Sequence, residues 1–115
     1  MFGRPIGKNQ SIQHPLAENW SELMAAELMT LRAAELYDSG QPCGAEANAA
    51  KYLAGDANFN ACDRAIRTHG GMGYASEFNV ERYFREAVGM RLAPVSRELI
   101  LCYIAERVLG LPKSY

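Results

Sequence analysis

The feature that most constrains this fold is a long helical repeat of apolar residues near the start of the chain. Between Ser11 and Tyr37, apolar side chains recur every three or four positions, and charged residues occupy the other faces. This spacing places the apolar residues on one stripe of an α-helix. The stripe consists of Leu16, Trp20, Leu23, Met24, Leu28, Leu31 and Ala34. We predict a long amphipathic helix that begins near Gln10 to Ser11, so that Pro15 can lie in its first turn.

A second long helix is predicted over 45–68, after the turn sequence "DSGQPCG". This segment is rich in alanine, and its stripe at helical spacing consists of Tyr52, Gly55, Phe59, Cys62 and Ile66. Small side chains let another helix approach closely, which would offset the cost of about 1 kcal/mol that glycine carries in a helix interior. We expect this helix to run antiparallel to the first.

Two shorter helices are predicted over 79–88 and 96–109, the second ended by Gly110 and Pro112. No segment alternates as a half-buried strand does. The sequence therefore predicts one all-α domain over 1–115, a four-helix up-and-down bundle with two long and two shorter helices.

The second and last helices are apolar on more than one face, which a chain of 115 residues hardly covers. We therefore expect a homo-oligomer, a dimer or tetramer, or a partner subunit. A formal charge of -1 argues against nucleic acid or an acidic membrane surface as a partner. The longest apolar run, "LILCYIA", is much shorter than the roughly 20 residues of a spanning helix, and no signal core precedes it. A soluble cytoplasmic protein is expected.

No metal site is predicted. Cys43, Cys62 and Cys102 show neither CxxC nor Cys/His spacing, and we interpret them as small buried thiols. His14 and His69 lie far apart in the sequence with no ligand pattern nearby, so a helix-end hydrogen bond or plain exposure is the interpretation for both.

Three glycines stand in four positions at Gly70, Gly71 and Gly73. A dinucleotide fingerprint would need a third glycine where Ser76 stands and a strand before it, and a P-loop would need a lysine that is absent. We predict that Gly70 or Gly71 ends the second helix in a left-handed conformation and that Gly73 permits a tight turn.

Three longer segments carry a family resemblance: "HGGMGYASEFNVERYFREA", "FGRPIGKNQSIQHPLAE" and "IAERVLG". In this order and with these separations they resemble the acyl-CoA dehydrogenase family, and they match its C-terminal helical domain only. Complete members also have an N-terminal helical domain and a middle β-domain, which bind acyl-CoA and flavin. The resemblance implies that this chain begins just inside the third domain, without that domain's usual first helix.

The resemblance implies FAD-dependent α,β-dehydrogenation of an acyl-CoA thioester. A carboxylate removes the α-proton, a hydride leaves the β-carbon for flavin N5, and the electrons pass to an electron-transferring flavoprotein. In this family the C-terminal domain packs tetramers together and reaches the adenosine diphosphate part of a neighbouring subunit's FAD.

Several residues match family positions beside that cofactor. Phe2 matches an aromatic residue next to FAD, and Gln10 matches a glutamine that hydrogen-bonds the adenosine diphosphate portion. Gly70 and Gly71 match loop backbone near the same nucleotide. Arg67 stands where many members have a glutamine, and an arginine can pair with a diphosphate through a bidentate, charge-assisted contact. Helix capping or solvated surface is the alternative role for each of these residues.

Ser96 matches a threonine near the flavin, although the N-cap of the last helix is the role that we favour for it. Arg82 and Arg85 match family arginines, and we expect them to pair with neighbouring Glu81 and Glu86 or with helix-end carbonyls.

The chain departs from the family at the catalytic base. Where most members have Tyr-Glu-Gly-Thr, this sequence has Ala93, Pro94, Val95 and Ser96, and the upstream helix that holds the base in another branch is not in this chain. Arg4 lies on the wrong side of the Phe-Gly pair to replace the family's diphosphate-binding arginine. We interpret Glu86 and Glu98 as surface carboxylates, so no catalytic residue is predicted.

Two functions follow from these observations. The first is the C-terminal domain of an acyl-CoA dehydrogenase, as a fragment or a truncated gene product, which contributes FAD contact and oligomerisation but is inactive alone. The alternative is a helical oligomerisation or docking module without flavin.

Overall fold

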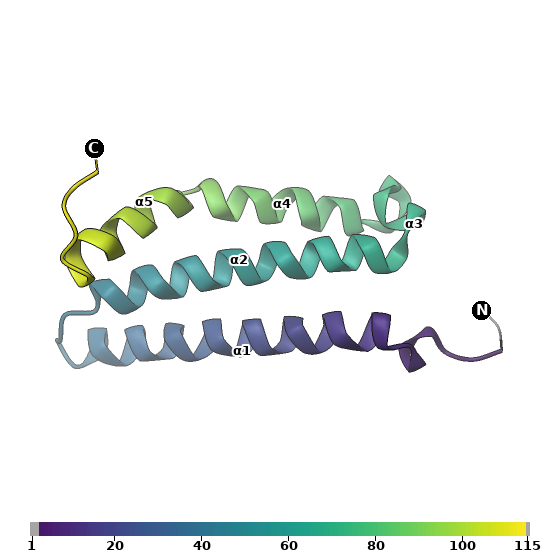
Figure 1. Cartoon of the computed structure of the whole chain (residues 1–115), viewed down its shortest axis with the longest axis horizontal. Coiled ribbons are helices and arrows are strands. Elements are labelled where there is room, and N and C mark those ends of the chain that lie inside the picture. The colour runs from purple at the N-terminus through teal and green to yellow at the C-terminus, as the bar shows by residue number, and fades with distance from the viewer. Residues whose placement is uncertain (1–2, 115) are drawn as a thin grey trace.

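Two long antiparallel helices dominate the computed structural model, which describes residues 3–114 (Figure 1). Helix α1 spans Gln10–Asp38 and α2 spans Gly44–His69, within one residue of the predicted bounds. Pro15 is the sixth residue of α1 and so lies in the second turn rather than the first. Pro15 has no N–H to donate to the carbonyl of Ser11. Because Ser11 is exposed, water can donate to this carbonyl instead.

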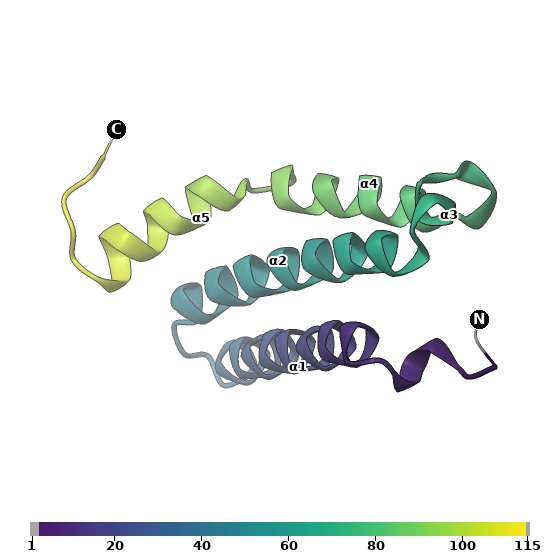
Figure 2. The same cartoon turned by 45° about the vertical axis from the view of Figure 1, so that its right-hand side comes forward.

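The remaining helices form a third row beside α2. Helix α4 spans Val80–Leu92 and α5 spans Arg97–Tyr103, and five residues of π-helix, η3 (Ile104–Val108), continue α5. Both views show α4 and α5 end to end along α2, so α2 lies between α1 and the α4–α5 row (Figures 1 and 2). The described helices therefore form an open layer of three rows, in which the chain direction alternates between rows.

Three shorter helical turns accompany these rows: η1 (Ile6–Lys8) precedes α1, and α3 (Gly71–Tyr74) and η2 (Ser76–Phe78) connect α2 to α4. The all-α prediction, with two long and two shorter helices, is confirmed in residues 3–114. The structure differs in detail: α4 continues to Leu92, four residues beyond the predicted end, and the glycine segment contains the single turn α3.

The predicted apolar stripe of α1 does not face α2. Its large members Leu16, Trp20 and Leu31 are more than half exposed, with Trp20 at 67%. The buried residues of α1 are instead Ala26, Ala33 and Leu36. The small side chains of Ala26 and Ala33 allow the two long helices to approach closely, so packing selects the alanine side of α1 rather than its bulkiest side.

The predicted stripe of α2 faces the α4–α5 row. The rings of Phe59 and Phe84 lie 5.3 Å apart between centroids, and a Cβ at Gly55 would lie 3.7 Å from Arg91 Cγ. The latter distance is an ordinary contact, so alanine would fit at position 55. Glycine is therefore not required there by close packing.

The layer is thin for a chain of this mass. Its accessible surface is 8213 Å², whereas a compact monomer of 12.7 kDa is expected to expose about 6,200 Å². The radius of gyration is 17.6 Å against about 13 Å for a compact domain of this length. Much apolar surface is therefore left exposed, as the apolar faces in the sequence predict. Within residues 3–114, no helix is apolar over a length sufficient to cross a bilayer.

Candidate nucleotide site

The residues that the sequence analysis singled out gather mainly at one end of the molecule. The start of α1 and the end of α2 lie at this end because the two helices are antiparallel (Figure 1). A groove of about 310 Å³ lies between them. Its lining consists of Ser11, Ile12, Pro15, Arg64, Arg67 and Thr68. Gln10 is the residue before this lining and Gly70 lies two residues after it, whereas Phe2 falls outside the described residues.

The N-terminus of α1 has no side-chain cap. Asn9 stands at the N-cap, but its side-chain oxygen accepts a hydrogen bond from Arg4 Nη2 at 2.6 Å instead of from the helix. No acidic residue occupies the first turn, where exposed Gln10 is the first residue. The partial positive charge of this helix end is therefore not offset by a local carboxylate.

Arg67 contributes a cation to the groove from the last turn of α2. Its Nε donates to Asp63 Oδ2 at 2.8 Å, four residues earlier on the same helix. The Arg67 side chain is 77% exposed, so this ion pair is solvated and weak. A phosphate could therefore replace Asp63 as the partner of Arg67 at little cost.

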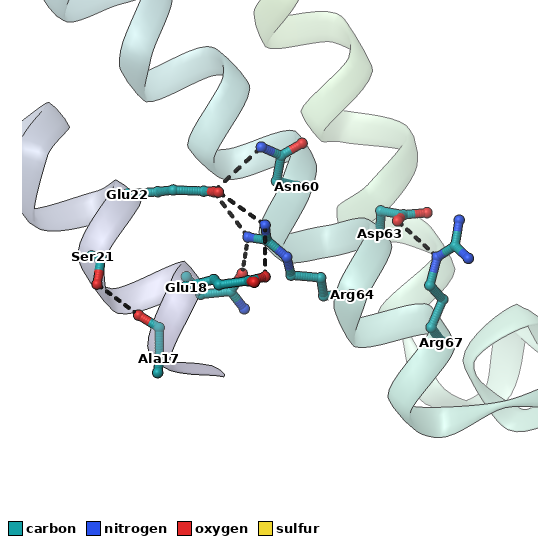
Figure 3. A network of polar contacts seen from close by, with 9 residues as sticks. Ala17, Glu18, Ser21, Glu22, Asn60, Asp63, Arg64 and Arg67 are labelled. Carbon is teal, nitrogen blue, oxygen red and sulfur yellow. Dashed lines mark hydrogen bonds and ion pairs between the residues drawn. The ribbon is translucent and has the colours of Figure 1, made fainter. Parts of the chain in front are cut away.

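Arg64, by contrast, is held from several sides (Figure 3). Its two terminal nitrogens donate to the two oxygens of Glu22, both at 2.9 Å, and Nη1 also donates to Asn19 Oδ1 at 2.7 Å. Glu18 lies 3.2 Å from Nη2, and Asn60 donates to Glu22 at 3.3 Å. This Arg64 network joins α1 to α2 beside the groove.

The Arg64 network also changes the acidity of its members. The hydrogen bond from Arg64 is the main cause that lowers the pKa of Glu22, against a smaller opposing effect of burial. The same bond is the main cause that raises the pKa of Arg64. Both shifts favour the charged pair, so Arg64 acts as a structural cation rather than a free one.

The three glycines have different roles. Gly70 follows α2 with φ of +61°, a conformation that favours glycine and ends the helix as predicted. A Cβ on Gly73 would lie 2.6 Å from the carbonyl oxygen of Ile66, so the return of the chain over α2 requires glycine there. Around Gly71 a Cβ would meet nothing within 4 Å. The backbone at Gly71 is therefore open to approach from outside.

Ser96 lies away from the groove, at the break between α4 and α5. Its Oγ accepts a hydrogen bond from the backbone N–H of Leu99 at 3.3 Å, which is the N-cap role favoured from the sequence. The structure brings Gln10, Arg67 and the glycines to one end of the layer but leaves Ser96 on the other side of α2.

A second polar cluster lies beside this break. Asp56 of α2 accepts from Arg97 at 3.1 and 3.2 Å, and Arg97 also donates to the hydroxyl of Tyr52 at 3.0 Å. Arg91 Nε lies 3.1 Å from Asp56, which is an ion-pair distance without hydrogen-bond geometry. Lys51 Nζ donates to the carbonyls of Met90 and Ala93 at the end of α4. This Asp56 network attaches both short helices to α2.

Sequence reasoning missed both networks. Their members lie about 40 residues apart in the chain, and no local spacing relates them. The pairs that it did predict are local: Arg82 lies 3.0 Å from Glu86 and Arg85 lies 3.7 Å from Glu81. His69 Nδ1 lies 2.8 Å from the carbonyl of Ala65, at the helix end as expected. Among residues 3–114, no three His, Cys, Asp or Glu side chains gather as metal ligands would.

Comparison with known proteins places these features in a family. Residues 1–109 match the family described as "Acyl-CoA dehydrogenase, C-terminal domain". Acyl-CoA dehydrogenase FadE12 of Mycobacterium tuberculosis is 44% identical over an alignment that covers 100% of this chain and 30% of that protein. The chain thus spans about a third of this relative's length.

Comparison with solved structures agrees with the sequence comparison. Butyryl-CoA dehydrogenase from Megasphaera elsdenii superposes with a TM-score of 0.89 at 30% identity, covering 95% of this chain and 28% of that one. The structure described as the FAD complex of PigA gives a TM-score of 0.88 at 27% identity, covering 96% and 29%. The sequence match over nearly the whole chain and the shared helical arrangement lead to one conclusion: the chain belongs to the acyl-CoA dehydrogenase family, as its C-terminal domain.

Proposed function

We propose that this chain is the part of an FAD-dependent acyl-CoA dehydrogenase that contacts the adenosine diphosphate portion of FAD and joins subunits. The observation that carries the first role is the groove that Arg67 lines beside the uncapped N-terminus of α1, with Gln10 and Gly70 close in sequence to its lining residues. Ser96 and Phe2 remain proposed contacts to the same cofactor by resemblance alone.

The residues at this end fit an anionic nucleotide. Arg67 can exchange its exposed contact with Asp63 for a phosphate, and the α1 N-terminus favours negative charge. Open space at Gly71 permits the backbone to approach a ligand. FAD, when bound, supplies the acceptor for the hydride from the β-carbon of the acyl thioester. The role of this chain is to bind and orient the nucleotide part.

This chain by itself is proposed to be inactive. At the matched position of the family's base stands Pro94, which cannot accept a proton, and Ser96 is used as a helix cap. Removal of the α-proton would therefore fall to a carboxylate outside this chain. Acyl-CoA and an electron-transferring flavoprotein are proposed partners of the complete enzyme.

The test is FAD binding to the purified chain at high protein concentration. We expect FAD to raise the melting temperature and its fluorescence to be quenched, and Gln10→Ala to weaken both effects. Gln41→Ala is the matched control, because Gln41 is also exposed but lies at the opposite end of α1 and α2. Absence of any response to FAD, or equal effects of the two substitutions, would contradict the proposed cofactor contact.

A second candidate function, assembly without flavin, is supported by the exposed apolar surface of the layer. It predicts oligomers in light scattering whether or not FAD is present. A flavin-independent oligomer that does not bind FAD would favour this second function over the first.

A further inference from the structure

Arg4 engages the side chain that would otherwise cap α1. Its Nη2 donates to Asn9 Oδ1 at 2.6 Å, and the backbone of Asn9 has φ of -93° and ψ of 135°, the extended conformation of a capping residue. A guanidinium has donors and no acceptor, so the amide oxygen of Asn9 is the atom that faces Arg4. The amide nitrogen of Asn9 cannot accept a hydrogen bond from the helix. Asn9 therefore has the backbone of an N-cap residue without its side-chain bond.

The start of α5 shows the bond that the start of α1 lacks. There Ser96 stands at the N-cap in a similar extended conformation, and its Oγ accepts from the N–H of Leu99. Asparagine caps helices about as well as serine does. The residue type and the backbone of Asn9 both suit a cap, so the contact with Arg4 is what separates the two helix starts.

Two N–H groups in the first turn of α1 are open as a result. The Asn9 carbonyl accepts from the backbone N–H groups of Ile12 and Gln13, at 2.9 and 3.0 Å. In the described part of the chain, the N–H groups of Gln10 and Ser11 have no protein acceptor. Ser11 is the second residue of α1, a position from which an N-cap side chain accepts, and it lines the candidate nucleotide groove. The N–H that Asn9 leaves open thus belongs to a residue of the groove.

The segment before α1 is tied to the helix, which keeps Arg4 beside the helix start. Gln13 Nε2 donates to the carbonyl of Gly7 at 2.8 Å. The N–H of Asn9 donates to the carbonyl of Ile6 at 2.9 Å and so joins η1 to α1. Arg4 itself is exposed, whereas Asn9 is half-buried. The bond between them therefore starts from a held loop rather than from a free arm.

We propose that Arg4 is a positioning residue of the nucleotide site, which holds the side chain of Asn9 away from α1. The N–H groups of Gln10 and Ser11 then stay free to donate to a phosphate of the ligand. An anion gains from both of these donors and from the partial positive charge of the helix end. Arg4 acts through Asn9 and not by contact with the ligand. This inference rests on the proposed cofactor contact and deepens it.

The competition for Asn9 has a physical basis. The donor in the bond from Arg4 is charged, and a charge-assisted bond is stronger than the neutral bond that the N–H of Ser11 would make. Without Arg4, the side chain of Asn9 is free to turn toward Ser11 and cap the helix. A phosphate must then displace this cap before it can bind to the same N–H, so its affinity falls.

The first test is a set of FAD titrations followed by quenching of flavin fluorescence. We expect Arg4→Ala to raise the Kd for FAD about fivefold, the change that corresponds to a cap of about 1 kcal/mol. Adding Asn9→Ala to Arg4→Ala should return the Kd to near the wild-type value, because no capping side chain is left to compete. Lys8→Ala is the matched control, because Lys8 is also an exposed cation of this segment, while Asn9 Oδ1 is bonded to Arg4. The control should change the Kd less, and adding Asn9→Ala to it should reverse nothing.

The second test follows the N–H of Ser11 in the chain without FAD, by amide hydrogen exchange in NMR spectra. Exchange should be fast in the wild-type chain, and several-fold slower in Arg4→Ala, in which Asn9 caps the helix. It should be fast again when Asn9→Ala is added, and the melting temperature should fall by a few degrees as the cap is lost. The double variant would then be less stable than Arg4→Ala and yet bind FAD more tightly. General damage to the fold would move stability and affinity in the same direction.

Three results would overturn this inference alone. One is unchanged exchange at Ser11 in Arg4→Ala, because Arg4 would then not hold Asn9 away from the helix. Another is an Arg4→Ala chain that binds FAD as tightly as the wild-type chain. The third is an equally raised Kd with and without Asn9→Ala, which would make Arg4 a direct contact to the phosphate. A wild-type chain that does not bind FAD would instead overturn the proposed cofactor contact together with this role of Arg4, so the two failures are distinguishable.

Discussion

The two sides of the helix layer differ in how their side chains contact the rest of the chain. We call the side that carries the groove lined by Ala49 of α2 and Met29 of α1 the polar face. The opposite side, the apolar face, carries Trp20 of α1 and the groove between α2 and α4 that Asn58 and Tyr83 line.

Asp56 and Asn60 lie on the polar face, since they are seven and eleven positions from Ala49 on α2. Their networks join α2 to the rows on both sides of it. The apolar face holds Trp20 and Tyr83 in solvent. The polar networks that join the helix rows thus lie on one side of the layer, and exposed Trp20 and Tyr83 lie on the other.

The two networks are also opposite in charge. One has a single guanidinium, Arg64, among the carboxylates of Glu18 and Glu22, and the other has a single carboxylate, Asp56, between Arg91 and Arg97. Removing the central residue of either network leaves like charges facing each other. The polar face should therefore be sensitive to single substitutions at these centres, and the apolar face should not.

Asp56→Ala should have the largest effect on stability. It removes the one carboxylate that faces two partly buried arginines, and with it the ion pairs of α4 and α5 to α2. We expect a loss of about 2–3 kcal/mol in the free energy of unfolding, measured by urea denaturation. Asp63→Ala is the control, because it breaks a solvated pair, and an equal loss for both substitutions would contradict the assigned role of Asp56.

Glu22→Gln should have an intermediate effect that depends on pH. Arg64 lowers the pKa of Glu22 below its ordinary value of 4.5, so the charged pair stabilises the fold above that pH. The stabilisation is lost as pH falls through the lowered pKa of the folded state. We expect a loss of about 1 kcal/mol at pH 7 that shrinks below about pH 4, measured by denaturation across pH.

Arg64→Met should also cost free energy of unfolding at pH 7 and cost less below about pH 4, because it removes the main cause of the lowered pKa of Glu22. Adding Glu22→Gln to Arg64→Met should change the pH dependence of the free energy of unfolding little further. A Glu22→Gln loss that is as large at pH 3 as at pH 7 would show that the pair is not responsible.

Leu16→Gln on the apolar face should have the smallest effect. Leu16 is 58% exposed, so we expect a change below about 0.5 kcal/mol at a dilution where light scattering shows monomers. Leu36→Gln is the contrasting control, because Leu36 is 5% exposed between the long helices and should cost several times more. Comparable losses at both positions would mean that the apolar face is packed within the chain.

Local sequence patterns predicted those features that depend on neighbouring residues. The bounds of α1 and α2 follow from periodicity, and the end at Gly70 follows from the conformational freedom of glycine. The pairs Arg82–Glu86 and Arg85–Glu81 follow from the spacing of four residues on a helix. The N-cap role of Ser96 is local in the same sense.

The candidate site was predicted only in part. Gln10, Arg67 and the glycines were identified by resemblance to a family, and the antiparallel helices bring them to one end. Arg64 in the same groove was missed, because its partners Glu18 and Glu22 lie more than 40 positions earlier and no periodic pattern relates them. Long-range ion pairs depend on how helices are placed side by side, which periodicity does not encode.

The sequence by itself determined that this chain is helical, where its long helices begin and end, and to which family its motifs belong. Only the tertiary structure decided which side of α1 is packed. The bulky stripe that includes Leu16 and Trp20 predicted an amphipathic helix, yet close approach of α2 requires small residues, so Ala26 and Ala33 are buried instead. The physical reason is that the helical spacing of apolar residues shows only that a helix has an apolar side. The neighbouring helix then packs on the side that it can approach closely.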